Sequence, residues 1–589
     1  MAQRFRANVR EFIAENPAER AQAEHKWVKP PFDESNGLFV KMGADDNPDR
    51  PLCQAFDVVG RSSNLAGDAG AGRIIRFINE NGVDVEMTLD RSALFKADGG
   101  GVLDALADAG MDLRFSGKIG RSDMLDLLRT IKSDRQIPVS PHPGWTRDRA
   151  GYVTGFLCPT GEFIAVSADA PDMRLHSSAT AKDRLPSGTL DGWKASAKEA
   201  KTNFHWTLGL CAGFAGPVLD LIGGLPCGVN LSGDSSLGKT IALMLGTTVW
   251  TSAVSGKGNF HVMNSTPNAL EDLFTMGSGT ITALDEIGAL QNAAALGAML
   301  FGASSGSGKS RKAGRGVGLA ETAEFCTVTL LTNEHGLKDT ITGAGGTYKT
   351  GLSVRFPDVD VTAVKKVSAD VLAKLDMAKE NFGHAGPEFI RYLISEGWHT
   401  KPEELKKRVK DTAAKIAGKD AAPALRRAAQ VFALFQVAGE LAAEAGLIEK
   451  KPIKAAVKTA FNVFRQSDEG RATTGGDSLL DGLRSWVVRN IGRTLVNAEE
   501  AADPSYREAR GWVTATHVIL DYELLADMKG MGLSGKRDTL LDALDKAGAL
   551  ERSGKNRMHN KLPAAVKLDG GATEKRAANV RIKRDVLGV

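Results

Sequence analysis

Residues 228–245 constrain the fold more than any other part of the chain. A short apolar run leads to Gly233, four residues follow, and then Gly238, Lys239 and Thr240 open an apolar helical stretch. This is the pattern G-x-x-x-x-G-K-[ST] between a strand and a helix, the context that a phosphate-binding loop requires. The pattern therefore predicts an α/β core that binds a nucleotide.

Each part of this loop has an expected role. The glycines let successive backbone N–H groups turn toward phosphate oxygens, and the helix that begins at Lys239 adds its dipole. Lys239 is expected to reach the β- and γ-phosphates, and Thr240 to bind Mg²⁺ through its hydroxyl, so ATP and Mg²⁺ are the expected cofactors. The residues expected to contact the nucleotide are Gly233, Asp234, Ser235, Ser236, Leu237, Gly238, Lys239 and Thr240.

The composition of the chain limits the class of protein in which this loop lies. A chain of 589 residues with 42% hydrophobic and 25% charged residues is typical of a globular protein with three or four domains. The net charge of +4 means that any surface for a polyanion must be local. The five cysteines form no C-x-x-C pair, which argues against a zinc site and for the cytoplasm. We interpret residues 206–225 as buried helix rather than a membrane span, and we see no signal peptide.

Two further strand ends carry polar residues. Residues 280–284 have a buried-strand pattern that ends in Asp285 and Glu286, expected to hold Mg²⁺ and to deprotonate the attacking water, respectively. An ordinary solvated strand end is the alternative. The next strand, 327–332, ends at Asn333, which is the sensor candidate, although an Asn that caps the next helix would fit the same pattern.

Here the sequence resembles a known family. Gly233–Thr240, Leu284–Glu286, Leu331–Asn333 and Ser353–Asp358 are similar to Walker A, Walker B, sensor 1 and the arginine finger of AAA+ ATPases, the last as in minichromosome-maintenance (MCM) helicases. Further segments resemble the domain-of-unknown-function 927 family, MCM-like helicases carried by phages, plasmids and other mobile elements. These segments are Gly144-Trp145, Asn264–Glu271 and Phe432–Ala442.

The resemblance implies a hexameric ring in which subunits share sites. Arg355 would act on the neighbour's γ-phosphate, or it is a surface arginine. Either Arg427 or Arg426 would be sensor 2, also acting across the interface. Within a Gly/Ser-rich turn between Walker B and sensor 1, four cations would form a DNA-binding pore hairpin, or the turn is a solvated loop. These four cations are Lys309, Arg311, Lys312 and Arg315.

Five parts are expected along the chain. They are an N-terminal arm (1–36), an α+β collar (37–186), the AAA+ P-loop core (187–365), a helical lid (366–470) and a winged-helix-like block with a basic tail (475–589). The combined prediction is a cytoplasmic, ATP-dependent DNA helicase or translocase that serves replication of a mobile element or phage. The alternative is an AAA+ remodelling or regulatory NTPase that acts on protein partners.

Overall fold

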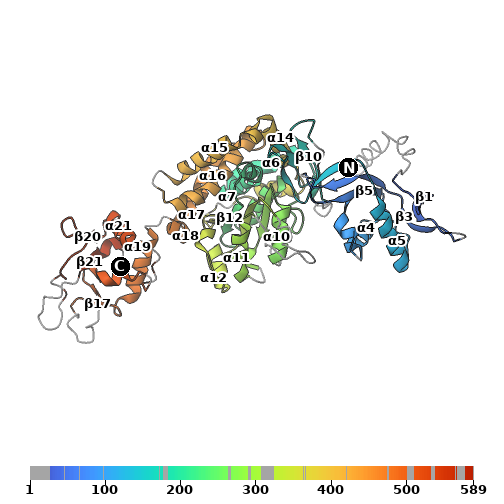
Figure 1. Cartoon of the computed structure of the whole chain (residues 1–589). Helices are drawn as coiled ribbons and strands as arrows, with labels where there is room; N and C mark the ends of the chain where they lie inside the picture. The colour runs from blue at the N-terminus through green and yellow to red at the C-terminus, as the bar shows by residue number, and fades with distance from the viewer. Residues whose placement is uncertain are drawn as a thin grey trace.

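The computed structural model describes most of the chain outside the first 26 residues. The described residues are 27–44, 47–65, 67–96, 98–170, 173–176, 184–262, 267–289, 293–306, 324–362, 364, 367–418, 421–473, 477–499, 510–528, 530–531, 533, 537–563, 566 and 578–587. Figure 1 shows them as three bodies in a row, with the N-terminal block at one end and the C-terminal block at the other.

The N-terminal block contains an antiparallel three-stranded sheet and a mixed five-stranded sheet, in which β7 pairs in parallel with β4 and β11. Its core lies between the strands and three helices, where Phe39, Leu106 and Leu127 are fully buried. The first strand falls in a segment for which the sequence suggested a loose arm. The elements are β1 (Phe32–Ser35), β2 (Leu38–Lys41), β3 (Arg50–Gln54), β4 (Asp57–Ser63), β5 (Gly72–Ile78), β6 (Asp84–Asp90), α3 (Arg91–Leu94), α4 (Val102–Asp108), α5 (Gly117–Thr130), β7 (Gln136–Ser140) and β11 (Arg174–Leu175), with sheets β1-β2-β3 and β11-β7-β4-β5-β6.

A small antiparallel sheet connects this block to the centre. It consists of β8 (Gly144–Arg147), β9 (Val153–Leu157) and β10 (Phe163–Ala165). Trp145 Nε1 donates to the Pro217 carbonyl at 3.0 Å. A Cβ on Gly279 would lie 2.3 Å from the Cα of Gly144, so the two backbones are in close contact and position 279 has no room for a side chain. The Gly144-Trp145 segment is therefore a packing contact with the central body.

The central body is organised around a parallel five-stranded sheet. Its order is β13-β14-β15-β12-β16, so the strand that follows β14 in the chain is inserted next to β12. All residues of β12, β14 and β15 are buried, as in sheets covered on both faces. The strands are β12 (Cys227–Ser232), β13 (Phe260–Val262), β14 (Ile281–Asp285), β15 (Val328–Thr332) and β16 (Asp358–Asp360).

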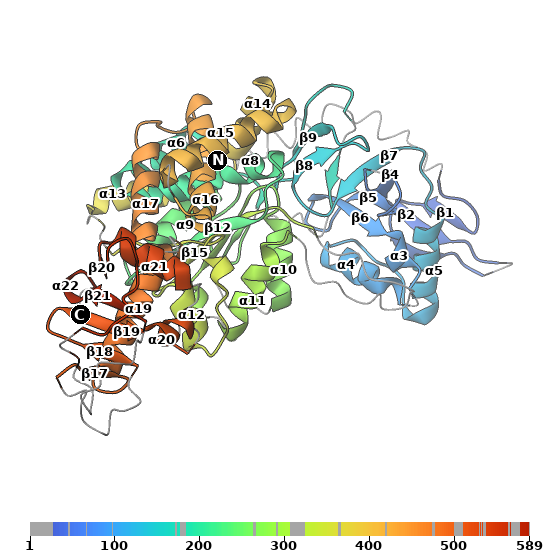
Figure 2. The same cartoon turned by 60° about the vertical axis from the view of Figure 1, so that its left-hand side comes forward.

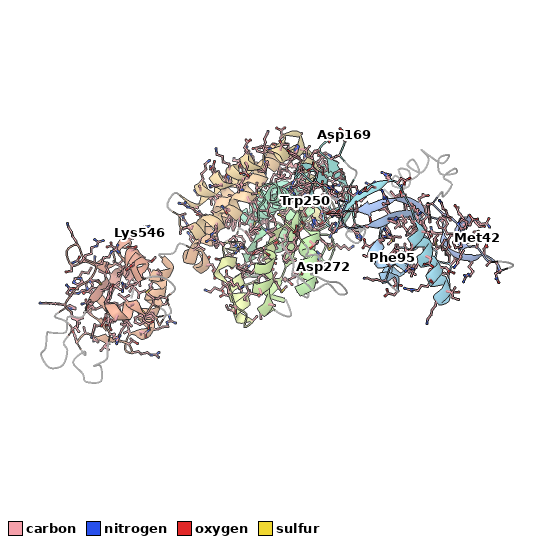
Figure 3. All side chains as sticks on the ribbon, viewed as in Figure 1. Met42, Phe95, Asp169, Trp250, Asp272 and Lys546 are labelled. Carbon is pink, nitrogen blue, oxygen red and sulfur yellow. The ribbon has the colours of Figure 1, made fainter. Side chains whose placement is uncertain are left out.

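Helices cover both faces of this sheet, as Figure 2 shows. Alternate strand residues face opposite ways: Ala283 and Leu330 join the cluster that contains α7 and α9, whereas Leu284 packs with α10 to α12. Trp250 lies inside this body (Figure 3) and is 1% exposed. The helices are α6 (Leu190–Ala197), α7 (Phe204–Gly213), α8 (Ala215–Leu221), α9 (Lys239–Thr248), α10 (Pro267–Met276), α11 (Ala293–Ala303) and α12 (Leu337–Gly343).

A helical region follows the sheet. Its longest helix, α16, is buried over most of its length and packs on α7, where Gly439 lies against the side chain of Cys211. The helical periodicity of residues 368–464 predicted this region. The helices are α13 (Ala369–Asp376), α14 (Ala385–Ser395), α15 (Pro402–Ala417), α16 (Pro423–Glu444), α17 (Ile453–Gln466) and α18 (Asp468–Thr473).

The C-terminal block has its own core, centred on Leu483, Leu520 and Leu544. Two arginines of the basic tail form ion pairs here: Arg557 with Asp542 at 2.6 Å, and Arg581 with Glu551 at 3.1 Å. The elements are α19 (Asp477–Asn490), β17 (Leu495–Asn497), β18 (Gly511–Val513), β19 (His517–Asp521), α20 (Tyr522–Ala526), α21 (Arg537–Lys546), β20 (Leu550–Glu551), β21 (Asn579–Lys583) and α22 (Arg584–Leu587), with sheet order β17-β18-β19-β21-β20.

Among the residues that the structure describes, no helix combines the length and the apolar composition needed to cross a bilayer. The stretch 206–225, which the sequence predicted to be buried helix, contains α7 and α8, and these two helices are buried beneath the central sheet.

Candidate nucleotide site

A cleft of about 1280 Å³ opens at the carboxyl ends of β12, β14 and β15. In parallel α/β sheets, ligands bind at this edge, beside the point where the strand order reverses. The cleft is lined by the loop 235–238 with the start of α9, by Asp285 and Glu286, by residues 332–335 and by one side of α12. The structure therefore brings together the phosphate-loop pattern and the two polar strand ends that the sequence indicated.

The loop 233–238 has the strained backbone expected of an anion-binding turn. Gly233 and Gly238 have φ values of 135° and 77°, and Ser236, which has a side chain, has φ 66°. A Cβ on Gly238 would lie 2.8 Å from Nε1 of Trp206. Only glycine therefore fits at position 238, both because of its left-handed backbone and because the indole lies against it.

Two side chains of α7 hold this loop from below. Trp206 Nε1 donates to the Gly238 carbonyl at 2.9 Å, and His205 Nε2 lies 3.1 Å from the Leu237 carbonyl. Burial lowers the pKa of His205 to about 4, so the ring is neutral and Nε2 carries the proton that it donates. No local sequence pattern indicates these contacts, because α7 lies some 30 residues before the loop.

Lys239 is already turned toward the loop. Its Nζ donates to the carbonyls of Gly233 and Asp234. Burial lowers its pKa, while the carboxylates of Glu334 and Asp285 oppose that shift. The ammonium therefore lies where it would meet a phosphate group in the cleft.

Thr240 and Asp285, the two expected Mg²⁺ ligands, lie in hydrogen-bond contact. Thr240 Oγ1 is 3.0 Å and 3.3 Å from the two carboxylate oxygens of Asp285, and the Thr332 hydroxyl also donates to this carboxylate. Within the described residues no group of three His, Cys, Asp or Glu side chains could hold a metal. A Mg²⁺ that is shared with phosphates needs only one or two protein ligands, so the Thr240–Asp285 pair fits that ion.

Glu286 stands next to this pair with an unusual backbone. Its φ is 54°, its side chain is exposed in the cleft, and its N–H donates to the Thr332 hydroxyl at 3.0 Å. Left-handed backbone in a non-glycine residue is costly and is concentrated at functional sites. The conformation turns the chain after β14, so that Asp285 remains buried while the carboxylate of Glu286 lies in the open cleft.

Asn333 lies between the two other strand ends, because β15 is inserted between β12 and β14. Its N–H donates to Leu231 O at 3.1 Å, and its amide Nδ2 donates to the Thr340 hydroxyl on α12. Its neighbour Glu334 accepts a bond from the Ser235 hydroxyl at 2.9 Å. This link between the loop and β15 is a further feature of the site that the sequence motifs did not indicate.

A buried carboxyl supports the floor of the cleft. Asp358 accepts from Asn230 Nδ2 at 2.6 Å and from the backbone N–H of Leu337, the first residue of α12, at 3.0 Å. Burial raises the pKa of Asp358 to about 7. Asp358 thus fixes α12, whose Thr340 contacts Asn333, against the strand that leads into the phosphate loop.

The arginine candidates lie away from the cleft of their own chain. Arg355 is half-buried, donates from Nη1 to Gly351 O at 3.1 Å, and lies 5.2 Å from the ring centre of Phe301. Arg426 and Arg427 are exposed near the start of α16. None of the three is among the described residues that line the cleft, so any action on a nucleotide would require a second subunit.

The hairpin predicted to contact DNA lies outside the described residues. Lys309, Arg311, Lys312 and Arg315 lie in residues 307–323, outside the described part of the chain. Their proposed role stays a prediction.

Comparisons with known proteins add two findings. The family model named Domain of unknown function (DUF927) matches residues 34–318, just under half of the chain. A solved structure named "SCCmec type IV Cch - active helicase" is similar over 95% of this chain and 99% of that chain, with 17% identity and a TM-score of 0.65. At this identity the likeness is one of fold. No curated protein matches the sequence.

Proposed function

We propose that this chain is an AAA+ ATPase that translocates along DNA and unwinds it, acting as a hexameric ring in the replication of a mobile element. One observation carries the proposal: Thr240 and Asp285 meet at 3.0 Å directly beneath the phosphate loop, with Glu286 next to them. The likeness in fold to a structure named as an active helicase, and the match to the DUF927 family model, support the choice of nucleic acid as the substrate.

In this proposal each residue of the cleft has a separate role in ATP binding or hydrolysis. The backbone amides of the loop and Lys239 hold the phosphates, and Thr240 and Asp285 hold Mg²⁺, which neutralises charge on the phosphate oxygens. The carboxylate of Glu286 accepts the proton of the attacking water. Asn333, fixed by Thr340, orients that water or the γ-phosphate.

The neighbouring subunit completes the site. The carbonyl of Arg355 accepts from the N–H of Gly228 near the amino end of β12, at the edge of the sheet opposite the cleft, which suits a guanidinium that reaches into the cleft of the next subunit. Arg427 or Arg426 acts from α16 across the same interface. A head-to-tail contact of this kind closes into a ring, for which we propose six subunits. The hairpin with Lys309, Arg311, Lys312 and Arg315 then contacts the DNA backbone in the pore.

A forked-DNA unwinding assay tests the proposal, with the wild type beside Lys239→Ala. We expect the wild type to separate the strands only with ATP and Mg²⁺, single-stranded DNA to raise its ATPase rate, and Lys239→Ala to lose both activities. A wild type that hydrolyses ATP at a rate unaffected by DNA, and leaves the fork intact, would instead favour a remodelling NTPase with protein partners.

A further inference from the structure

A second cavity lies on the helical region, away from the nucleotide cleft. It has a volume of about 930 Å³ and is bounded by α15 on one side and α17 on the other, with Gln436 and Glu440 of α16 at its floor. We refer to it as the α15–α17 groove. Six cationic and three carboxylate side chains line it, so its local net charge is +3.

Most of these cations form no ion pair with another described residue. Arg408 is paired with Glu440 at 3.1 Å, which neutralises the carboxylate at the floor. In contrast, the other five cations form no ion pair within the described part of the chain, unlike the arginines of the C-terminal block. The five are Lys407, Lys415, Lys454, Lys458 and Arg465.

The cationic side chains are aligned along the length of the groove. On α17, Lys454, Lys458 and Arg465 fall at i, i+4 and i+11, which places them on one helix face along about 16 Å. On α15, Lys407 and Lys415 are eight residues apart and face them across the groove. Two of the carboxylates, Glu404 and Asp411, form no ion pair with the described residues, and both belong to α15. The α17 wall therefore carries only positive charge, over the length of several phosphates.

We propose that the α15–α17 groove binds the phosphodiester backbone of a DNA strand, with the phosphates against α17. This rests on the proposed function, because it names a second contact surface for the same nucleic-acid substrate. Lysines in a row contact phosphates without reading the base sequence. The carboxylates of Glu404 and Asp411 keep the phosphates on the α17 side. None of the residues that line the groove lines the nucleotide cleft, so the strand and the nucleotide would contact different side chains.

The test measures binding of a fluorescein-labelled oligo(dT) to the full chain, without nucleotide, over a range of salt concentrations. The variant is Lys454→Ala with Lys458→Ala. Each phosphate contact contributes about 0.7 to the slope of log K against log salt for a single strand, so we expect the slope to fall by about 1.4. The matched control is Lys374→Ala with Lys379→Ala, two exposed lysines already paired with Asp370 and Asp376, which should leave the slope unchanged.

Further arms separate the outcomes. The variant Lys454→Arg with Lys458→Arg should keep the wild-type salt slope. The groove variants and the Lys374→Ala, Lys379→Ala control should all keep the wild-type ATPase rate measured without DNA. An unchanged salt slope in the Lys454→Ala, Lys458→Ala variant would overturn the proposal that the groove binds DNA. The proposed helicase function would still stand if the wild type unwinds forked DNA. Loss of poly-glutamate binding with intact DNA binding would overturn it in favour of an acidic protein partner. A wild type that binds no DNA would remove both proposals.

Discussion

The nucleotide cleft and the α15–α17 groove are built in opposite ways. In the cleft, the polar side chains are engaged with one another: Thr240 with Asp285, and Ser235 with Glu334. In the groove, Lys454 and Lys458 stand on an exposed helix face without ion pairs among the described residues. The difference shows that one site is preorganised by strand ends within the protein, whereas the other has charges that a ligand would have to neutralise.

The comparison predicts that changes at the cleft alter turnover and leave the groove intact. The largest effect is expected for Arg355→Ala, which should lower the ATPase rate by about 10³–10⁵ because charge on the transferred phosphoryl group is no longer neutralised. Mixing this variant with Lys239→Ala should recover part of the activity, since some interfaces then combine an intact loop with an intact finger. A mixture as inactive as its components would show that Arg355 does not act across an interface.

Glu286→Gln should have the next largest effect. The amide keeps the shape of the side chain but cannot accept the proton, so we expect the ATPase rate to fall by about 10²–10⁴. ATP affinity, measured with a fluorescent analogue, should remain close to that of the wild type, and oligo(dT) binding should keep its salt slope. If the variant kept the wild-type ATPase rate, Glu286 would not be the base that activates water. If its salt slope for oligo(dT) changed, the cleft and the groove would not act separately.

A smaller effect, on the free energy of unfolding, is expected from the ionisation of Asp358, the buried carboxyl that supports the floor of the cleft. The pKa of Asp358 is about 7 in the folded chain and about 3.9 when unfolded. Between these values the unfolded chain releases the proton and the folded chain keeps it, so a rise in pH favours unfolding. Relative to Asp358→Asn, the wild type should lose about 2 kcal/mol between about pH 5.5 and 7.5.

Urea unfolding at several pH values measures this difference. The control is Asp360→Asn, which changes an exposed carboxyl on the same strand and should give a difference that does not vary with pH. Equal pH dependence in the two variants would mean that Asp358 is not the group that titrates. The groove should bind oligo(dT) alike in both variants.

The same contrast explains what the sequence could predict. The phosphate loop, Asp285 and Asn333 each follow a buried strand, and parallel strands bring their carboxyl ends to one edge, so contiguous motifs were enough. The contacts of Trp206 with Gly238, and of Asp358 with Leu337, join segments far apart in the chain and have no local pattern. The sequence analysis also missed the groove, because its charges are dispersed along two helices whose charged faces have the pattern of ordinary solvent-exposed faces.

The small sheet beside the N-terminal block, and the first strand of that block, illustrate the same limit. The Gly144-Trp145 pair was recognised as part of a family resemblance, but its physical reason is the backbone contact with Gly279, which only the fold reveals. The strand β1 was missed because its charged sequence, Phe32–Ser35, gains its pairing from β2 rather than from hydrophobic alternation.

Helix α7 has a mechanical consequence. Its first turn grips the phosphate loop through Trp206, and farther along it packs against α16 at Gly439 and against α9, where Gly209 lies against Ala242. Close-packed interiors transmit displacement instead of absorbing it. Helix α7 therefore acts as a strut: a displacement of the loop 233–238 would be transmitted through α7 to α16, the helix at the floor of the α15–α17 groove.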